Sequence, residues 1–138
     1  MPTRTAELVI RTSGPGLYAI GDQVGAVVAS CAADEGLCTV FVAHTSASVL
    51  IQENADPDVR RDLDAFFRRL VPEGDPLFTH NDEGPDDMPA HIKAALTAAS
   101  VSIPIVGGRM VLGMWQGIYL WEHRRDPHAR RVIVSVTS

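Results

Sequence analysis

The alternation of apolar and polar positions predicts strands in the first half of the chain. ELVIRT, residues 7–12, has the composition of a strand and is followed by SGPG, a sequence typical of a turn. CTVFVAH, residues 38–44, alternates with period two, and SASVLIQEN, residues 46–54, is expected to follow it as an antiparallel neighbour. One face of the strand at 38–44 is expected to hold Cys38, Val40, Val42 and His44.

The segment ADPDVRRDLDAFFRRLVP, residues 55–72, has the strongest helical pattern in the chain. Asp56 is placed to cap it, and Pro57 is the expected first helical residue, where its missing N–H costs nothing. Apolar residues then recur with the 3.6-residue period of a helix. This apolar stripe consists of Val59, Leu63, Phe66, Phe67 and Leu70.

Two shorter segments also predict helices. QVGAVVASCAA, residues 23–33, follows Asp22 as the expected cap and is expected to close near Gly36. A further helix is expected from about Met88 to Ser100.

The last third of the chain predicts strands. VSIPIV at 101–106, the turn GGR and the segment at 110–123 suggest a hairpin with a long second arm, and RRVIVSV at 130–136 a final strand. Alternation along the long arm divides its side chains between two faces. One face is expected to hold Trp115, Tyr119, Trp121 and His123. The other is expected to hold Met114, Gln116, Ile118, Leu120 and Glu122.

Helices that interrupt a mostly antiparallel sheet place residues 1–138 in the α+β class, as one domain whose sheet can curl into a barrel. The formal net charge of −5 argues against a nucleic-acid partner. No apolar run reaches membrane-spanning length and the N-terminus lacks a signal-peptide pattern, so the expected location is the cytoplasm, with no membrane partner. Cys31 and Cys38 suggest neither a disulfide framework nor a zinc–thiolate site.

The segment HNDEGPDDMPAH, residues 80–91, is the first candidate for chemistry. Asp86 and Asp87 are accounted for as carboxylates at a helix start, which leaves His80, Asp82 and His91 without a structural explanation. Histidines beside a carboxylate suit zinc or another transition metal, whereas carboxylates alone suit magnesium.

The segment HTSAS, residues 44–48, is the second candidate. Its hydroxyls and the backbone N–H groups of a tight turn can bind an anion, although a histidine at a strand end can also serve only as a hydrogen-bonding group. His123 ends its own strand, and we expect His44, His91 and His123 to meet in one pocket. Glu53 and Asn54 point to opposite faces, so at most one should join them. The late cluster of basic residues is expected to be a solvated turn, with an anion site as the alternative. It consists of Arg124, Arg125, Arg130 and Arg131.

Together, HTSAS, ENADPDVRRDL, HNDEGPDDMPAHIKAAL and GMWQGIYLWEHR resemble the YjbQ-like family, also called the secondary thiamine-phosphate synthase family. The resemblance runs from about Leu8 to Val136. It implies a mixed, mostly antiparallel sheet curled into a closed barrel with two to three flanking helices, and a homotrimer. Trp121 departs from the family, because many relatives have YLCEHR there, and this change is expected to alter packing beside His123.

The resemblance also implies a weak ability to join a pyrimidine diphosphate to a thiazole phosphate, with release of diphosphate. Position by position, it carries over His44, Ser46, Glu53, Asn54, His80, Asp82, Asp87, His91, Gln116 and His123. The expected catalytic residues are His44, Asp82, His91 and His123. The expected substrate-binding residues are Thr45, Ser46, Asn54 and Gln116. The candidate ligands of a divalent metal are His44, His80, Asp82, Asp87, His91 and His123, not all at once.

The chemistry of this condensation requires charge stabilisation on the departing diphosphate and alignment of two rings. Magnesium held by Asp82 or Asp87 would stabilise the charge of the diphosphate. The HTSAS turn would hold the phosphate of the thiazole half, and His91 or His123 would deliver a proton. Two alternatives stay open. One is a zinc-dependent hydrolase of a phosphorylated small molecule, and the other a trimeric protein that binds a metal or a small anion without turnover.

Overall fold

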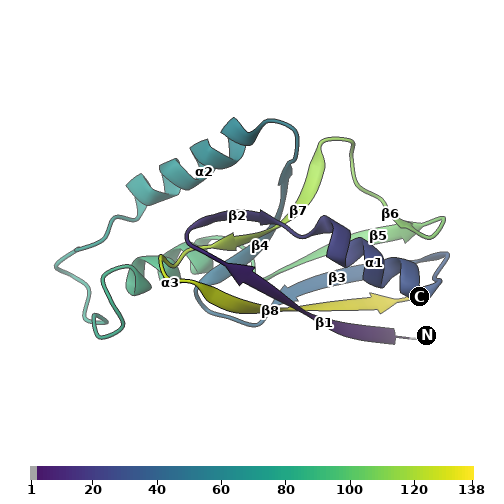
Figure 1. Cartoon of the computed structure of the whole chain (residues 1–138), viewed down its shortest axis with the longest axis horizontal. Coiled ribbons are helices and arrows are strands. Elements are labelled where there is room, and N and C mark those ends of the chain that lie inside the picture. The colour runs from purple at the N-terminus through teal and green to yellow at the C-terminus, as the bar shows by residue number, and fades with distance from the viewer. Residues whose placement is uncertain (1–2) are drawn as a thin grey trace.

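The structure is a computed structural model that describes residues 3–138. Three helices and eight strands make up this part of the chain (Figure 1). Among these residues, no helix has both the length and the apolar character needed to cross a membrane. In chain order, the elements are β1 (Thr3–Thr12), β2 (Gly16–Ala19), α1 (Gly21–Cys31), β3 (Glu35–Val42), β4 (Ala47–Glu53), α2 (Pro57–Leu70), α3 (Asp87–Leu96), β5 (Ser100–Val106), β6 (Arg109–Met110), β7 (Gln116–Glu122) and β8 (His128–Thr137).

The strands form two antiparallel sheets. One sheet has the order β1-β8-β3-β5-β6, and the other has the order β2-β7-β4. The expected α+β class with a curled antiparallel sheet is therefore confirmed. The expected closed barrel is not, because no strand pairing within residues 3–138 joins the two sheets, and each described pair is antiparallel rather than mixed.

One predicted strand partnership is wrong, and a second, the hairpin of β5, is confirmed only for its first part, where β5 pairs with β6. β4 does not pair with β3, which lies between β5 and β8, but joins β7 in the other sheet. The predicted long arm after β5 also divides, since β6 ends at Met110 and the chain crosses to the second sheet before β7 begins. Alternation identifies the face of a strand that is buried and does not identify its neighbour, so these crossings could not be read from it.

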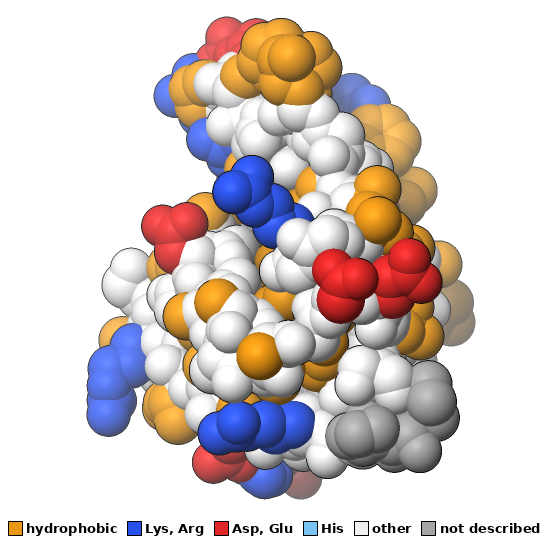
Figure 2. All heavy atoms as spheres, turned by 90° about the vertical axis from the view of Figure 1, so that its right-hand side faces the viewer, with side chains coloured by type: hydrophobic (Ala, Val, Ile, Leu, Met, Phe, Trp, Pro, Cys, Tyr) orange, Lys and Arg blue, Asp and Glu red, His pale blue; other side chains and the backbone are white. Residues whose placement is uncertain are grey.

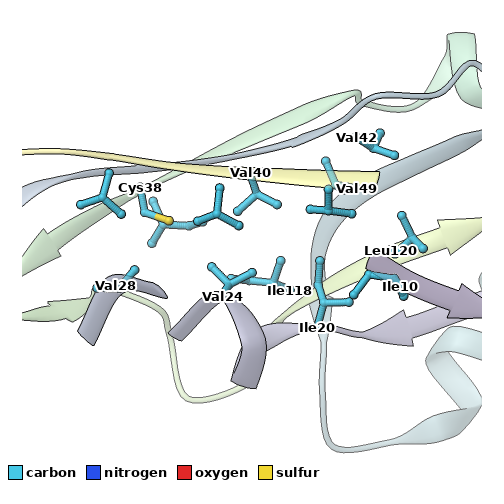
Figure 3. Packing of buried hydrophobic residues seen from close by; sticks show 14 of the residues in the cluster. Ile10, Ile20, Val24, Val28, Cys38, Val40, Val42, Val49, Ile118 and Leu120 are labelled. Atoms are coloured by element: carbon cyan, nitrogen blue, oxygen red, sulfur yellow. The ribbon is translucent and has the colours of Figure 1, made fainter. Parts of the chain in front are cut away.

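The hydrophobic core lies between the two sheets and α1 (Figure 3). Val24 and Val28 of α1 point into it, and the predicted inward face of β3 is confirmed by Val40 and Val42. The predicted cap at Asp22 is wrong, since this residue lies in the first turn of α1 and Ile20 occupies the N-cap. The core also includes Ile10, Ile20, Cys38, Val49, Ile118 and Leu120.

Gly36 does not close α1, as the sequence suggested, but lies inside β3. The helix ends instead at Ala32, which has a left-handed conformation with φ 51°. A Cβ at Gly36 would overlap the backbone oxygen of Thr137 on the neighbouring strand. This close approach of β3 to β8 explains why the position has no side chain.

We expect Gly36→Ala to lower the free energy of unfolding by about 1–3 kcal/mol, the usual cost of forced overpacking. Gly25→Ala is the matched control, because this glycine lies within α1 and a Cβ there meets nothing within 4 Å. The control should raise stability by about 0.5–1 kcal/mol. Urea unfolding of both variants measures the difference, and equal midpoints would show that the β3–β8 approach is not constrained.

The long helix α2 begins at the predicted residue and ends two residues before Pro72. The Asp56 carboxylate accepts a hydrogen bond from the Asp58 N–H at 2.9 Å, Pro57 is the first helical residue, and Leu70 is the last. α2 lies against the sheet formed by β2, β7 and β4, where the ring of Phe67 packs on Trp121 with 4.7 Å between centroids. No residue of α2 is fully buried in the single chain, so its apolar stripe is only partly covered.

Candidate metal site

His80, Asp87 and His91 come together where the loop at 71–86 meets the first turn of α3. The Nε2 atoms of His80 and His91 lie 2.7 Å and 3.0 Å from the same atom, Oδ2 of Asp87. The helix brings Asp87 and His91 together because residues four apart share one face. Two imidazole nitrogens and one carboxylate oxygen lie within 4.8 Å of one another, which is a spacing that one metal ion can bridge.

The proton positions of His91 explain why a cation suits this arrangement. Its Nδ1 lies 2.9 Å from the carbonyl oxygen of Thr45, and a carbonyl can only accept, so Nδ1 carries the hydrogen. In the neutral ring, the lone pair of Nε2 then faces a carboxylate oxygen of Asp87. Two acceptors at 3.0 Å repel each other unless a proton or a metal ion lies between them.

Asp87 is held in place by Arg124. This carboxylate is almost fully buried, with a side chain 2% exposed, and its Oδ1 accepts a hydrogen bond from Nη1 of Arg124 at 2.5 Å. The same guanidinium donates to Asp86 Oδ2 at 2.9 Å and to the Glu83 carbonyl at 2.9 Å. Burial raises the pKa of Asp87, but hydrogen bonding to His80 and the charge of Arg124 outweigh it, so this pKa is lowered. The acid that the sequence explained as a helix start is therefore also a candidate ligand.

Behind this cluster lies a buried ion pair, Glu122 with Arg130, which the sequence reasoning missed. The side chain of Glu122 is 0% exposed and that of Arg130 3%. Glu122 accepts from Nε of Arg130 at 2.8 Å, from Oγ1 of Thr12 at 2.6 Å, and from the backbone N–H groups of His123 and Arg124 at 3.1 Å each. Burial raises the pKa of Glu122, but the hydrogen bonds from Arg130 and Thr12 outweigh it and lower the pKa.

Arg130 also reaches the HTSAS turn. Its Nη2 donates to the hydroxyl of Ser46 at 3.0 Å and to the Ser46 carbonyl at 3.2 Å. The ion pair therefore joins this turn to the end of β7, where His123 and Arg124 follow. The expectation of a solvated turn is wrong for Arg124 and Arg130, which are occupied in these buried contacts. The hydroxyl of Ser46, a predicted substrate-binding group, therefore accepts a hydrogen bond from Arg130.

His44 and His91 line one cavity of about 280 Å³, together with Thr45. Nε2 of His44 accepts a hydrogen bond from the backbone N–H of Arg131 at 2.8 Å, which leaves Nδ1 as its available ring nitrogen. Burial, followed by the charge of Arg130, lowers the pKa of His44. His44 is not part of the group formed by His80, Asp87 and His91.

His123 lines a different and larger cavity, of about 450 Å³. It is 3% exposed, and its ring packs on Trp121 at 5.1 Å between centroids. Its Nε2 lies 2.9 Å from the hydroxyl of Ser48, which in turn contacts the hydroxyl of Thr97. The Thr97 hydroxyl donates to the Lys93 carbonyl at 2.8 Å, so Ser48 must donate to Thr97, and His123 donates from Nε2.

We expect His123 to make the protein less stable as the pH falls from 6.5 towards 4. Burial first, and then the charge of Lys93, lower its pKa from 6.5 to about 4, so the unfolded chain binds the proton more readily. Between these pH values His123 should remove about 3 kcal/mol from the free energy of unfolding. Urea unfolding at pH 7 and pH 4.5 measures this slope, which His123→Gln should reduce. A variant with the wild-type slope would contradict the assignment.

Asn54 and Gln116 lie at the other end of β7, whose seven residues span roughly 20 Å. The Asn54 amide donates to the carbonyls of Met114 and Gln116 at 3.2 Å and 3.3 Å, and Oε1 of Gln116 accepts from the Gly113 N–H at 2.7 Å. The side chains of Asn54 and Gln116 therefore bind the backbone of the loop before β7, far from the metal-ligand group.

Two other predicted site residues also lie outside the group. Asp82 is exposed and is not one of its three candidate ligands. Oε2 of Glu53 accepts from the backbone N–H groups of Ala55 and Asp56 at 2.8 Å and 2.7 Å, so this side chain organises the entrance to α2.

The fold and this group define an α+β domain that carries two histidines and a carboxylate arranged for one ion. The family described as UPF0047 protein YjbQ-like matches residues 6–138, and the chain belongs to that family. A Synechocystis protein named UPF0047 protein sll1880 is 58% identical over 130 residues, which are 94% of this chain and 88% of the relative. The UPF0047 protein YjbQ of Escherichia coli O157:H7 is 45% identical over 101 residues, which are 73% and 72% of the two chains.

Solved structures of similar proteins have the same fold. A yjbq/upf0047 family protein of Clostridium acetobutylicum superposes with a TM-score of 0.88 at 36% identity, over 96% of this chain and 99% of that one. A conserved hypothetical protein of Thermus thermophilus gives a TM-score of 0.84 at 33% identity, over 94% and 97%. None of these names states a reaction.

Proposed function

We propose that this chain is a metal-dependent enzyme that acts on small phosphorylated molecules, with the metal held by His80, Asp87 and His91. The observation that carries the proposal is the pair of acceptors, His91 Nε2 and Asp87 Oδ2, that face each other at 3.0 Å. Two nitrogens and one oxygen suit zinc or another transition metal better than magnesium, which prefers oxygen ligands. Three protein ligands leave a coordination position for water or for a substrate oxygen.

The reaction that we propose is a weak, secondary thiamine-phosphate synthase activity. A divalent cation bound at the three ligands would stabilise the negative charge of the departing diphosphate. The residues of the chain hold that geometry: Arg124 orients Asp87, the Thr45 carbonyl fixes the tautomer of His91, and the ion pair of Glu122 with Arg130 fixes the turn beside them. Membership of the family whose resemblance implied this activity supports the assignment.

A zinc-dependent hydrolase is the second candidate. It is favoured by the ligand set itself, because two histidines and one carboxylate are a common protein set for zinc that activates water. The His80 side chain is 42% exposed, so water reaches this edge of the group. The third candidate, a protein that binds a metal or a small anion without turnover, predicts tight binding and no product from either reaction.

Incubation of the purified protein with both thiamine halves and with zinc or magnesium tests the proposed reaction. We expect thiamine phosphate and diphosphate to form, and His91→Ala to abolish both products. A dedicated synthase assayed in parallel controls for the quality of the substrates. Hydrolysis of either phosphorylated half without condensation would favour the hydrolase, and no product at high protein concentration would overturn both enzymatic readings.

We also propose that the protein is a cytoplasmic homotrimer. The outer face of the five-stranded sheet supports self-association, since it exposes large apolar side chains on β1, β3 and β5. These side chains are Val9, Leu37, Phe41 and Val106, each between 43% and 57% exposed. Hydrophobic side chains also lie at the surface of the end of the molecule that carries both termini (Figure 2). Light scattering during size-exclusion chromatography tests the trimer directly.

A further inference from the structure

A cavity lined by charged side chains lies outside the metal-ligand group, between α2 and α3 and beside the turn at Ser13–Pro15. It has a volume of about 450 Å³, which suits a small metabolite. Pro89 and Lys93 of α3 line it, one helical turn apart. Helical periodicity places them on a different face from Asp87 and His91, so α3 separates this cavity from the candidate metal site.

Each acid that lines the cavity already has a basic partner. Asp64 accepts from Arg68 at 3.2 Å, and Glu73 is paired with Arg125. The third acid, Asp86, accepts from Nε of Arg124 at 2.9 Å and from the backbone N–H of Arg125 at 2.9 Å.

Lys93 is the cation that remains. Within residues 3–138 its amino group makes no hydrogen bond and no ion pair, and the only side-chain hydrogen bond that Lys93 receives is at its carbonyl, from Thr97. Every buried side-chain nitrogen or oxygen in the described chain has a partner, so the amino group is not sealed in the protein interior. It is therefore open to the cavity that Lys93 lines or to solvent.

The other side chains of the wall include uncharged groups. His123 lines the same cavity as a buried imidazole whose Nε2 hydrogen is directed to Ser48. Pro15 and Pro89 contribute apolar surface without charge. Three acids and three bases line the cavity, and Lys93 is the base among them without a direct ion-pair partner in the described chain, beside apolar and uncharged side chains that can contact the rest of a small molecule.

We propose that this cavity binds the oxyanion of a small molecule, a phosphate or a carboxylate, with Lys93 as the anchoring cation. The inference goes beyond the proposed function, because the cavity and the metal-ligand group lie on different faces of α3 and neither requires the other. It also gives a role to the only lysine among the 12 basic residues of the chain.

Because Lys93 is the single lysine of the chain, anion binding beside it can be measured directly. Protein labelled with ¹³C-lysine has one lysine side chain to report, so its Cε signal is a probe of this cavity alone. We expect inorganic phosphate to shift that signal saturably, in the presence of a metal chelator. A tighter response to phosphate than to acetate would identify a phosphorylated ligand, and the reverse order a carboxylate. A wild-type signal that stays in place with both anions would overturn the proposal.

Variants separate the cavity from the metal site. Lys93→Met should weaken phosphate binding, measured by calorimetry, by about ten- to hundredfold. Arg109→Met is the matched control, since it removes the same charge from an exposed position of β6 and should bind phosphate like the wild type. Equal binding by both variants would overturn the proposal. Phosphate binding that the chelator or His91→Ala abolishes would place the anion at the metal, which contradicts this inference and supports the proposed function.

Discussion

Replacing Glu122 by Gln should lower the free energy of unfolding by about 3–5 kcal/mol, the usual cost of breaking a buried ion pair. The substitution preserves the shape of the side chain and removes its charge. Arg130, 3% exposed, would then keep a buried charge without its counter-ion. Urea unfolding at pH 7 measures the loss, with the far-ultraviolet spectrum confirming that the variant folds.

The pair of Glu7 with Arg131 is the matched control, because it joins the same residue types on the surface. Its side chains are 45% and 57% exposed, so Glu7→Gln should change the free energy of unfolding by less than about 1 kcal/mol. The double variant Glu122→Gln with Arg130→Met should recover part of the loss, since it leaves no buried charge. A loss at Glu122 as small as that at Glu7 would show that the buried pair does not hold the fold together.

This ion pair also matters for the site, because its contacts are with the backbone that carries the site residues. Glu122 accepts the N–H groups of His123 and Arg124, and Arg130 holds the turn at Ser46. Arg124 in turn holds Asp87. A chain of charged contacts therefore runs from the interior to the candidate ligands, and loosening its buried end should loosen the metal-ligand geometry as well.

The elements could be predicted from the sequence because their signals are local. Asp56 and Pro57 define the start of α2 through the chemistry of the first helical turn, and alternation identified the buried face of β3. The pairing of β4 with β7 could not be predicted, since it depends on contacts between distant segments. β2, with four residues, is too short for a period to be recognised.

The sequence carries a signal of the buried ion pair of Glu122 with Arg130. Alternation placed Glu122 on the same face of its strand as Ile118 and Leu120, which form part of the core. Arg130 likewise falls in register with Val132 and the valines after it. One acid and one base, each on the apolar face of its own strand, are the pattern of a buried ion pair.

The predicted site histidines do not all lie in one group: His80 and His91 share it, and His44 and His123 lie outside it. A helix start does not account for His80 and His91, which makes them candidate ligands, and the structure brings them together. Asp87, which the helix start did account for, stands between them. A place in the first turn of a helix and a metal-binding role are compatible for one carboxylate, so a structural explanation does not exclude a chemical one. The contact of His91 with Thr45 joins residues 46 positions apart, which no local pattern indicates.

Replacing His91 by Ala should weaken zinc binding by more than about a hundredfold, because it removes a ligand, and changes to outer contacts alone cost about ten- to hundredfold. Arg124→Ala tests such an outer contact and should fall within that smaller range, since Arg124 orients Asp87 without facing the ion. Calorimetric titration with zinc, starting from chelator-treated protein, measures the affinities.

Asp82→Asn is the decisive comparison, because the sequence made Asp82 a candidate ligand and the structure leaves it outside the group. This variant should bind zinc like the wild type. Zinc at about a hundred times the wild-type dissociation constant should also add about 2.7 kcal/mol to the stability of the wild type and less than about 0.5 kcal/mol to that of His91→Ala. If Asp82→Asn lost binding while His91→Ala kept it, the ion would be held by loop carboxylates, and the repulsion between His91 and Asp87 would be relieved by a proton instead.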